Sequence, residues 1–158
     1  MPPLPDTDGL LAELSEAFLE VTRVMAEIAA RTLAAQEELT VLQYRALVVL
    51  AESGSSRVAA LAEALHVSPS TATRLCDRLV AKQLIGRNRS VEDRREVQVA
   101  LADNGRFLVE EVTRGRLGAI RAILAEIDEE RYPALLEAIA SFANASRELS
   151  PFGVPAGR

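Results

Sequence analysis

The segment from residue 67 to residue 95 constrains the fold of this chain most, because signals for a helix, a strand and a charged loop follow one another within it. Ser68 can accept a hydrogen bond from a free backbone amide of the next turn, and Pro69 suits the first helical position because it has no amide hydrogen to leave unpaired. A helix that begins here places four apolar residues on one buried face: Ala72, Leu75, Cys76 and Leu79.

The opposite side of this predicted helix carries small hydroxyl side chains and two arginines: Ser70, Thr71, Thr73, Arg74 and Arg78. Small side chains let a helix enter a major groove deeply, and arginines can reach base edges or phosphates. We therefore interpret it, with Ser68 at its start, as a DNA recognition helix. An ordinary amphipathic helix with a solvated polar face is the alternative, and the neighbouring segments distinguish the two.

These neighbours complete a known arrangement. A short helix is predicted from Val58 to Leu65, and a tight turn joins it to the recognition helix, as in a helix-turn-helix. A strand is predicted from Leu84 to Arg87, then a loop from Asn88 to Arg94, then a second strand from Arg95 to Leu101 in which apolar and polar residues alternate. A helix-turn-helix followed by a basic hairpin is a winged helix.

The predicted wing is rich in arginine: Arg87, Arg89, Arg94 and Arg95. On such a loop arginine has nothing to pack against, and the narrow minor groove of DNA attracts guanidinium groups. Asp93 would repel phosphate, so we expect it to pair with a neighbouring arginine and hold the loop in shape. These five residues form the predicted DNA-binding wing, with the four arginines as contacts and Asp93 as their support, and an ordinary charged surface hairpin is the alternative.

Three runs in the chain resemble the MarR family of winged-helix transcription regulators: LTVLQYRALVVL, LAEALHVSPSTATRLCDRLVAKQLIGR and VEDRREVQVAL. With Gly105 after them, the resemblance covers residues 39 to 106, and its most diagnostic element is Asp93-Arg94-Arg95. It implies a two-fold dimer in which the first and last helices interlock, and an arginine of that motif in the minor groove, with Arg95 favoured over Arg94. It also implies small aromatic acids as effectors, as in many family members.

Two positions depart from the family pattern. Gln83 stands where glycine commonly closes the recognition helix in a left-handed conformation, which would cost a non-glycine residue about 1 kcal/mol. We therefore expect this helix to end differently. Ala102 replaces the usual threonine before the next helix, and we expect Asp103 to take over the capping role.

The charge of the chain is unevenly distributed. The net charge is −5, yet residues 66 to 95 contain seven Lys or Arg against three Asp or Glu. A basic patch on an acidic body is typical of a local, specific DNA site, because phosphate attraction acts where the cations lie. The single cysteine, the absence of a signal-peptide pattern and the absence of a long uncharged apolar run predict a cytoplasmic protein without a membrane span.

The expected fold is mainly α with a small β-hairpin wing, arranged in three parts. Residues 1–37 form an N-terminal dimerisation helix with a disordered start, 38–102 the winged helix-turn-helix, and 103–158 C-terminal dimerisation helices and a tail. In the second part, Thr40 and Gln43 predict a capping box. The first helix carries an apolar stripe longer than a small core can cover, so we expect a second subunit to bury the rest.

Other candidate sites are weaker. Cys76 on the buried helix face is more simply a core residue than an oxidant sensor, and His66 a surface turn residue that can touch a phosphate. One histidine and one cysteine assemble no metal site, and no catalytic cluster or cofactor motif is present, so we expect no enzyme and no cofactor. Phe18, Tyr44 and Phe107 could line an effector cleft, but core is the favoured interpretation for each.

Together these observations predict a sequence-specific, homodimeric DNA-binding regulator, with a repressor of an inverted-repeat operator favoured. Its expected partners are double-stranded DNA, a second copy of the chain and a small aromatic effector. A helical protein-interaction module that kept the fold and lost DNA binding is the alternative.

Overall fold

The computed structural model describes residues 7–36, 39–89 and 97–148, and confirms a mainly helical winged-helix fold with a small antiparallel sheet. The chain separates into two compact units, residues 1–116 and 117–158. The elements, in chain order, are α1 (Thr7–Ala34), α2 (Val41–Ser53), β1 (Ser56–Arg57), α3 (Val58–Leu65), α4 (Pro69–Ala81), β2 (Ile85–Arg89), β3 (Val97–Leu101), α5 (Asp103–Leu124), η1 (Glu129–Arg131) and α6 (Tyr132–Glu148).

Helix α2 begins at the predicted capping box. The amide of Gln43 donates to Thr40 Oγ1 at 3.2 Å, and Gln43 Oε1 accepts from the amide of Thr40 at 3.0 Å. This arrangement satisfies two amides that the first helical turn would otherwise leave unpaired. Beyond the cap, Ala46, Leu47 and Leu50 are fully or almost fully buried. Helix α2 therefore lies at the centre of the core.

The helix-turn-helix consists of α3 and α4, and both helices end at a residue with a left-handed backbone. His66 closes α3 with φ 55°, and Gln83 follows α4 with φ 58°. At the end of α3, the amide of Val67 donates to the carbonyl of Ala62 and the amide of His66 to that of Glu63, each at 3.0 Å. At the end of α4, the amide of Leu84 donates to the carbonyl of Leu79 at 3.0 Å and the amide of Gln83 to that of Val80 at 2.9 Å. These are Schellman motifs. The expectation that α4 would end differently is therefore wrong, and Gln83 keeps the strained conformation.

The wing sheet has three strands in the order β1-β3-β2, all antiparallel. Strands β2 and β3 form the predicted hairpin, with Ile85 opposite Leu101 and Arg87 opposite Val99. Strand β2 runs two residues further than predicted, to Arg89. Strand β1, at Ser56 and Arg57, pairs with β3 and was not predicted, because two residues cannot display an alternating pattern.

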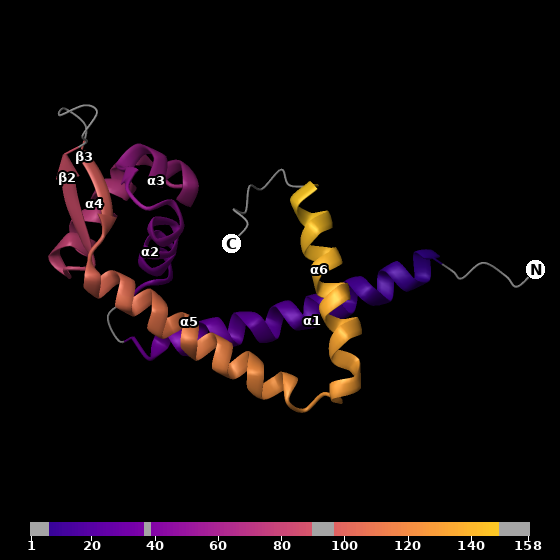
Figure 1. The fold of residues 1–158 in the computed structure, drawn as a ribbon. Coiled ribbons are helices and arrows are strands. Elements are labelled where there is room, and N and C mark those ends of the chain that lie inside the picture. Colours follow the sequence, from indigo (N-terminus) through magenta and orange to yellow (C-terminus); the bar gives the residue numbers. More distant parts are fainter. Residues whose placement is uncertain (1–6, 37–38, 90–96, 149–158) are drawn as a thin grey trace, which may run out of the picture. The chain divides into compact units, whose positions relative to one another are not determined.

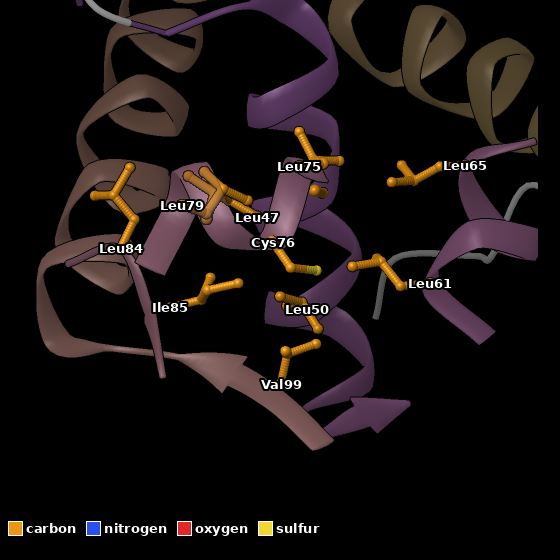
Figure 2. Close-up of a cluster of buried hydrophobic side chains, with 11 residues drawn as sticks. Leu47, Leu50, Leu61, Leu65, Leu75, Cys76, Leu79, Leu84, Ile85 and Val99 are labelled. Carbon is orange, nitrogen blue, oxygen red and sulfur yellow. The ribbon is translucent and has the colours of Figure 1, made fainter. Parts of the chain in front are cut away.

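The core of the winged helix lies between α2, α3, α4 and the hairpin (Figures 1 and 2). Leu47, Leu61 and Leu79 are completely buried, and Ile85 and Val99 close the core from the sheet. In Figure 2 these side chains converge from helices and strands on one cluster, which contains Cys76. Apolar side chains from three helices and two strands thus fix the orientation of α4 relative to the wing strands.

Helix α5 approaches the backbone just after α4 very closely. A Cβ atom built on Gly105 would overlap the carbonyl oxygen of Leu84, and this same carbonyl accepts the amide of Ala102 at 3.0 Å. Helix α5 begins at Asp103, and the first helical bond runs from the amide of Arg106 to the carbonyl of Ala102. Ala102 thus holds the N-cap position, so the expectation that Asp103 caps the helix is wrong. Asp103 lies in the first turn instead, where its negative charge is favourable near the helix N-terminus.

The second unit consists of the end of α5, the short helix η1 and α6. Tyr132 Oη donates to the carbonyl of Leu124 at 3.0 Å, across the turn that joins α5 to α6. The break coincides with the acidic run of residues 128–130 and with Pro133, which follows the first residue of α6. No helix in the described part of the chain is both long enough and apolar enough to cross a membrane.

Candidate nucleic-acid interface

Helix α4 exposes the residues that the sequence predicts to contact DNA. Its buried side is made of Ala72, Leu75, Cys76 and Leu79, as predicted, while Ser70, Thr71, Thr73, Arg74 and Arg78 are exposed. Because the core contacts fix the buried side, the exposed side is held in one orientation toward solvent. A rigid helix with small residues in its first turns and arginines further along has the shape that a major groove accepts.

The hydroxyl groups at the start of α4 form a local network around Ser68. Ser68 Oγ accepts the amide of Thr71 at 3.2 Å, and it lies 3.0 Å from Ser70 Oγ and 2.9 Å from Thr71 Oγ1. Thr73 Oγ1 donates to the carbonyl of Pro69 at 2.9 Å. Ser68 is thus the N-cap of α4, as predicted. The three contacts of Ser68 use the full hydrogen-bonding capacity of its hydroxyl, whereas the hydroxyls of Ser70, Thr71 and Thr73 can still accept further hydrogen bonds.

Arg87 is the one predicted wing residue whose side-chain contact the structure describes, and it differs from the expectation. It forms an ion pair with Asp77 of α4. Residues directly opposite in an antiparallel pair point to the same face, so Arg87 shares the inner face of the hairpin with buried Val99. The expectation that Arg87 has nothing to pack against is therefore wrong, and the sequence analysis missed its partner.

This ion pair lies at the rim of the core. The side chains of Arg87 and Asp77 are 41% and 54% exposed, so solvent screens their attraction, and the pair contributes at most about 1 kcal/mol to stability. One signal in the sequence was available: Asp77 is an acid on a helix face that is otherwise basic or neutral. Such a residue needs a cation nearby if the face is to meet phosphate.

The remaining wing residues are described only in part. Arg89 ends strand β2. Asp93, Arg94 and Arg95 lie outside the described residues, so the roles of these three in the wing stay predictions. The same holds for the choice of Arg95 over Arg94 as the minor-groove residue.

Cys76 and His66 occupy the positions expected of them. Cys76 is completely buried, and burial raises the pKa of its thiol; nearby Arg87 lowers the pKa and Asp77 raises it, both by less than the burial does. This supports a core role. His66 is exposed at the corner between α3 and α4. Across residues 7–36, 39–89 and 97–148, no three His, Cys, Asp or Glu side chains are grouped to hold a metal ion.

A second cluster joins α1, α2 and α5 within the first unit. Tyr44 is buried with Leu33 and Val112, and the guanidinium of Arg116 lies 4.7 Å from the centre of its ring. Arg116 Nε also donates to Thr32 Oγ1 at 3.4 Å. Arg116 was missed by sequence reasoning, although it lies four residues after buried Val112 on the same helix face, where a cation needs a partner.

The three aromatic candidates for an effector cleft differ in how deeply they are buried. Tyr44 belongs to the core, as favoured. Phe18 is half-buried, and Phe107 is 62% exposed. The core interpretation is therefore wrong for Phe107 in the single chain, because its position on α5 faces away from the packed elements.

Comparisons with known proteins agree with this geometry. The model of the MarR family matches residues 39–97. The HTH-type transcriptional repressor MdtR of Bacillus subtilis is 33% identical over 119 residues, which cover 74% of this chain and 77% of MdtR.

Two solved structures extend the match over most of the chain. The crystal structure of Rv1404 from Mycobacterium tuberculosis has 34% identity and a TM-score of 0.79, and the match covers 85% of this chain and 92% of that one. A mutant of S. aureus MepR bound to an oligodeoxyribonucleotide shares the fold at 22% identity and a TM-score of 0.66, with 84% and 96% of the two chains covered. With its helix-turn-helix, its hairpin and these relatives, the chain belongs to the MarR family of winged helix-turn-helix transcription regulators.

Proposed function

We propose that the protein is a homodimeric repressor that binds an inverted-repeat operator through α4 and the wing. The observation that carries this proposal is the exposed face of α4, where Ser70, Thr71, Thr73, Arg74 and Arg78 project from a helix whose other side is locked into the core. The name of the relative MdtR as a repressor, and the oligodeoxyribonucleotide bound to the MepR mutant, support it.

The proposed roles follow from side-chain chemistry. Arginine can bind a guanine edge with two hydrogen bonds, and the hydroxyls of the first turns can bond to either bases or phosphates. Arg89, Arg94 and Arg95 are proposed to reach the adjacent minor groove, with Asp93 holding the loop in shape. Two such half-sites, about one helical turn apart, would give the operator its two-fold symmetry.

A dimer is proposed because the terminal helices expose much apolar surface in the single chain. The exposed large apolar side chains of α1 include Leu10, Leu11, Leu14, Leu19, Val21, Val24 and Met25, and those of α6 are Tyr132, Leu136, Ile139 and Phe142. Apolar side chains in such number on two helices are typical of surfaces that a partner covers. A second copy is the partner that a two-fold operator requires.

The test is a titration of the purified protein against the duplex upstream of its own gene and a random duplex of equal length. We expect one dimer per site on the first duplex and much weaker binding on the second. Arg74→Ala should weaken operator binding by about 1 to 3 kcal/mol and relax the preference at one base pair. Equal losses on both duplexes would make Arg74 a phosphate contact, and absence of selective binding to any fragment of the genome would favour the interaction module.

We further propose that a small aromatic acid releases the protein from DNA by binding near Arg116. A half-buried guanidinium beside the ring of Tyr44 and the hydroxyl of Thr32 offers charge, an aromatic surface and a hydrogen-bonding group at one place. Benzoate-type acids should lower operator affinity, and Arg116→Gln should remove this response. A response of equal size in the variant would move the effector site elsewhere.

A further inference from the structure

An acidic residue lies on the side of α4 that is proposed to face DNA. Asp77 is exposed between Arg74 and Arg78, and a carboxylate in this place repels phosphate. Its charge is balanced by Arg87, which comes from strand β2. The pair therefore joins the recognition helix to the wing at the edge of the interface.

Arg87 is held toward the helix by the register of the hairpin. It follows buried Ile85 by two residues on the same strand face, and it lies opposite buried Val99. Side chains alternate along a strand, so Arg87 starts on the face that packs against α4, where Asp77 meets it. A half-exposed pair adds little to stability. Its main consequences are then the geometry that it fixes and the charge that it neutralises.

We propose that Asp77 is a specificity-determining residue that holds Arg87 against α4 and away from phosphate. In this arrangement Arg87 fixes the position of β2 relative to the recognition helix, and it adds no phosphate contact of its own. A cation released from this pair would bind phosphate on any sequence equally. The ion pair thus favours the operator over random DNA by keeping one non-specific contact per subunit from forming.

The test measures how binding to a random duplex depends on salt, because the slope of affinity against salt counts phosphate contacts. In Asp77→Asn the slope should steepen by about 0.9 per subunit, so that the loss of affinity between 50 and 200 mM salt grows about 3.5-fold per subunit. Arg87→Gln and the double variant should keep the wild-type slope. Asp77→Glu should also keep it, because the carboxylate remains.

A matched control is available on α5, where Glu111 and Arg114 form another exposed ion pair. Glu111→Gln changes the net charge equally and releases an arginine away from α4, so we expect the wild-type slope. On the operator found in the first experiment, Asp77→Asn should reduce the ratio of specific to random affinity, while Glu111→Gln should not.

Several results would overturn the inference. A shallower slope in Arg87→Gln would show that Arg87 contacts phosphate in the wild type. If Asp77→Asn steepened the salt slope equally in the wild-type and in the Arg87→Gln background, the effect would be one of charge alone. The same would follow if Glu111→Gln steepened the slope as much as Asp77→Asn. The inference rests on DNA binding, but the slopes need no operator. A wild type that binds no duplex rejects the proposed function and this inference with it, whereas unchanged slopes in a protein that binds reject the inference alone.

Discussion

Gly105 lets helix α5 pass the backbone of Leu84 at a distance that no side chain permits. Because a Cβ here would meet a backbone carbonyl and not a flexible side chain, the helix itself must shift. We expect Gly105→Ala to lower the free energy of unfolding by at least about 2 kcal/mol, the usual cost of overpacking a core. Chemical denaturation at one fixed protein concentration measures this loss.

Gly118 on the same helix is the control for Gly105. A Cβ on Gly118 meets nothing within 4 Å, so alanine there should only improve helix propensity, by up to about 1 kcal/mol. A small effect of Gly105→Ala, similar to that of Gly118→Ala, would mean that α5 packs further from Leu84 than described.

Cys76 is the residue at which burial should control chemistry. Its thiol pKa is raised, chiefly by burial, so the folded protein keeps the thiol protonated at a pH at which the unfolded chain begins to ionise. We expect a thiol-specific reagent at pH 8 to modify the unfolded protein rapidly and the native protein only as fast as it opens. The contribution of this group to stability is full below the pKa of the unfolded thiol and falls as the pH rises through the folded pKa. Rapid modification of the native protein would support a sensor role.

At the scale of elements, helix α4 ends at a residue whose backbone is better suited to glycine. Gln83 has φ 58°, which costs a residue with a Cβ about 1 kcal/mol. Gln83→Gly should therefore raise the free energy of unfolding by about this amount. In Ala81→Gly, the glycine falls on the last residue of α4, and we expect a loss of about 0.5 to 1 kcal/mol. If both variants lost stability, Gln83 would be making a contact that offsets its strain.

The two ends of α4 also show which parts of the fold can be predicted from sequence. The start was predictable because Ser68 and Pro69 act within one turn of chain. The end was not, because Leu84 and Ile85 must return into the core, and this tertiary requirement outweighs the local preference of Gln83. Strand β1 was missed for a related reason, since its two residues gain their structure only from β3.

The same distinction holds for the interface. The exposed face of α4 followed from helical periodicity, because it is the complement of a clear apolar stripe. The contact of Arg87 with Asp77 did not, because it joins two elements whose packing no local pattern encodes. Arg116 was overlooked in the same way, since its partners Thr32 and Tyr44 are remote in sequence.

At the scale of the whole molecule, the proposed dimer would bury the exposed apolar side chains of the terminal helices, and a substitution on α6 tests whether this helix lies in the interface. Leu136 is 70% exposed in the single chain. In a monomer, glutamate at this position would be solvated and nearly neutral for stability. In a two-fold dimer that uses this face, each Leu136→Glu loses about 1.5 to 3 kcal/mol of apolar burial and places a charge in the interface, twice per dimer.

We therefore expect Leu136→Glu to be largely monomeric at concentrations at which the wild type is a dimer, as measured by sedimentation equilibrium. Ser141→Glu adds the same charge on the polar side of α6 and should leave the dimer intact. Because two half-sites bound by one dimer act as a linked pair, the monomeric variant should also lose operator affinity far more than random affinity. If the Leu136→Glu protein stays dimeric and still prefers the operator to random DNA, the dimer contact would lie on the exposed apolar residues of α1. If the wild-type protein is monomeric and still prefers the operator, two-fold symmetry would not be needed for its selectivity.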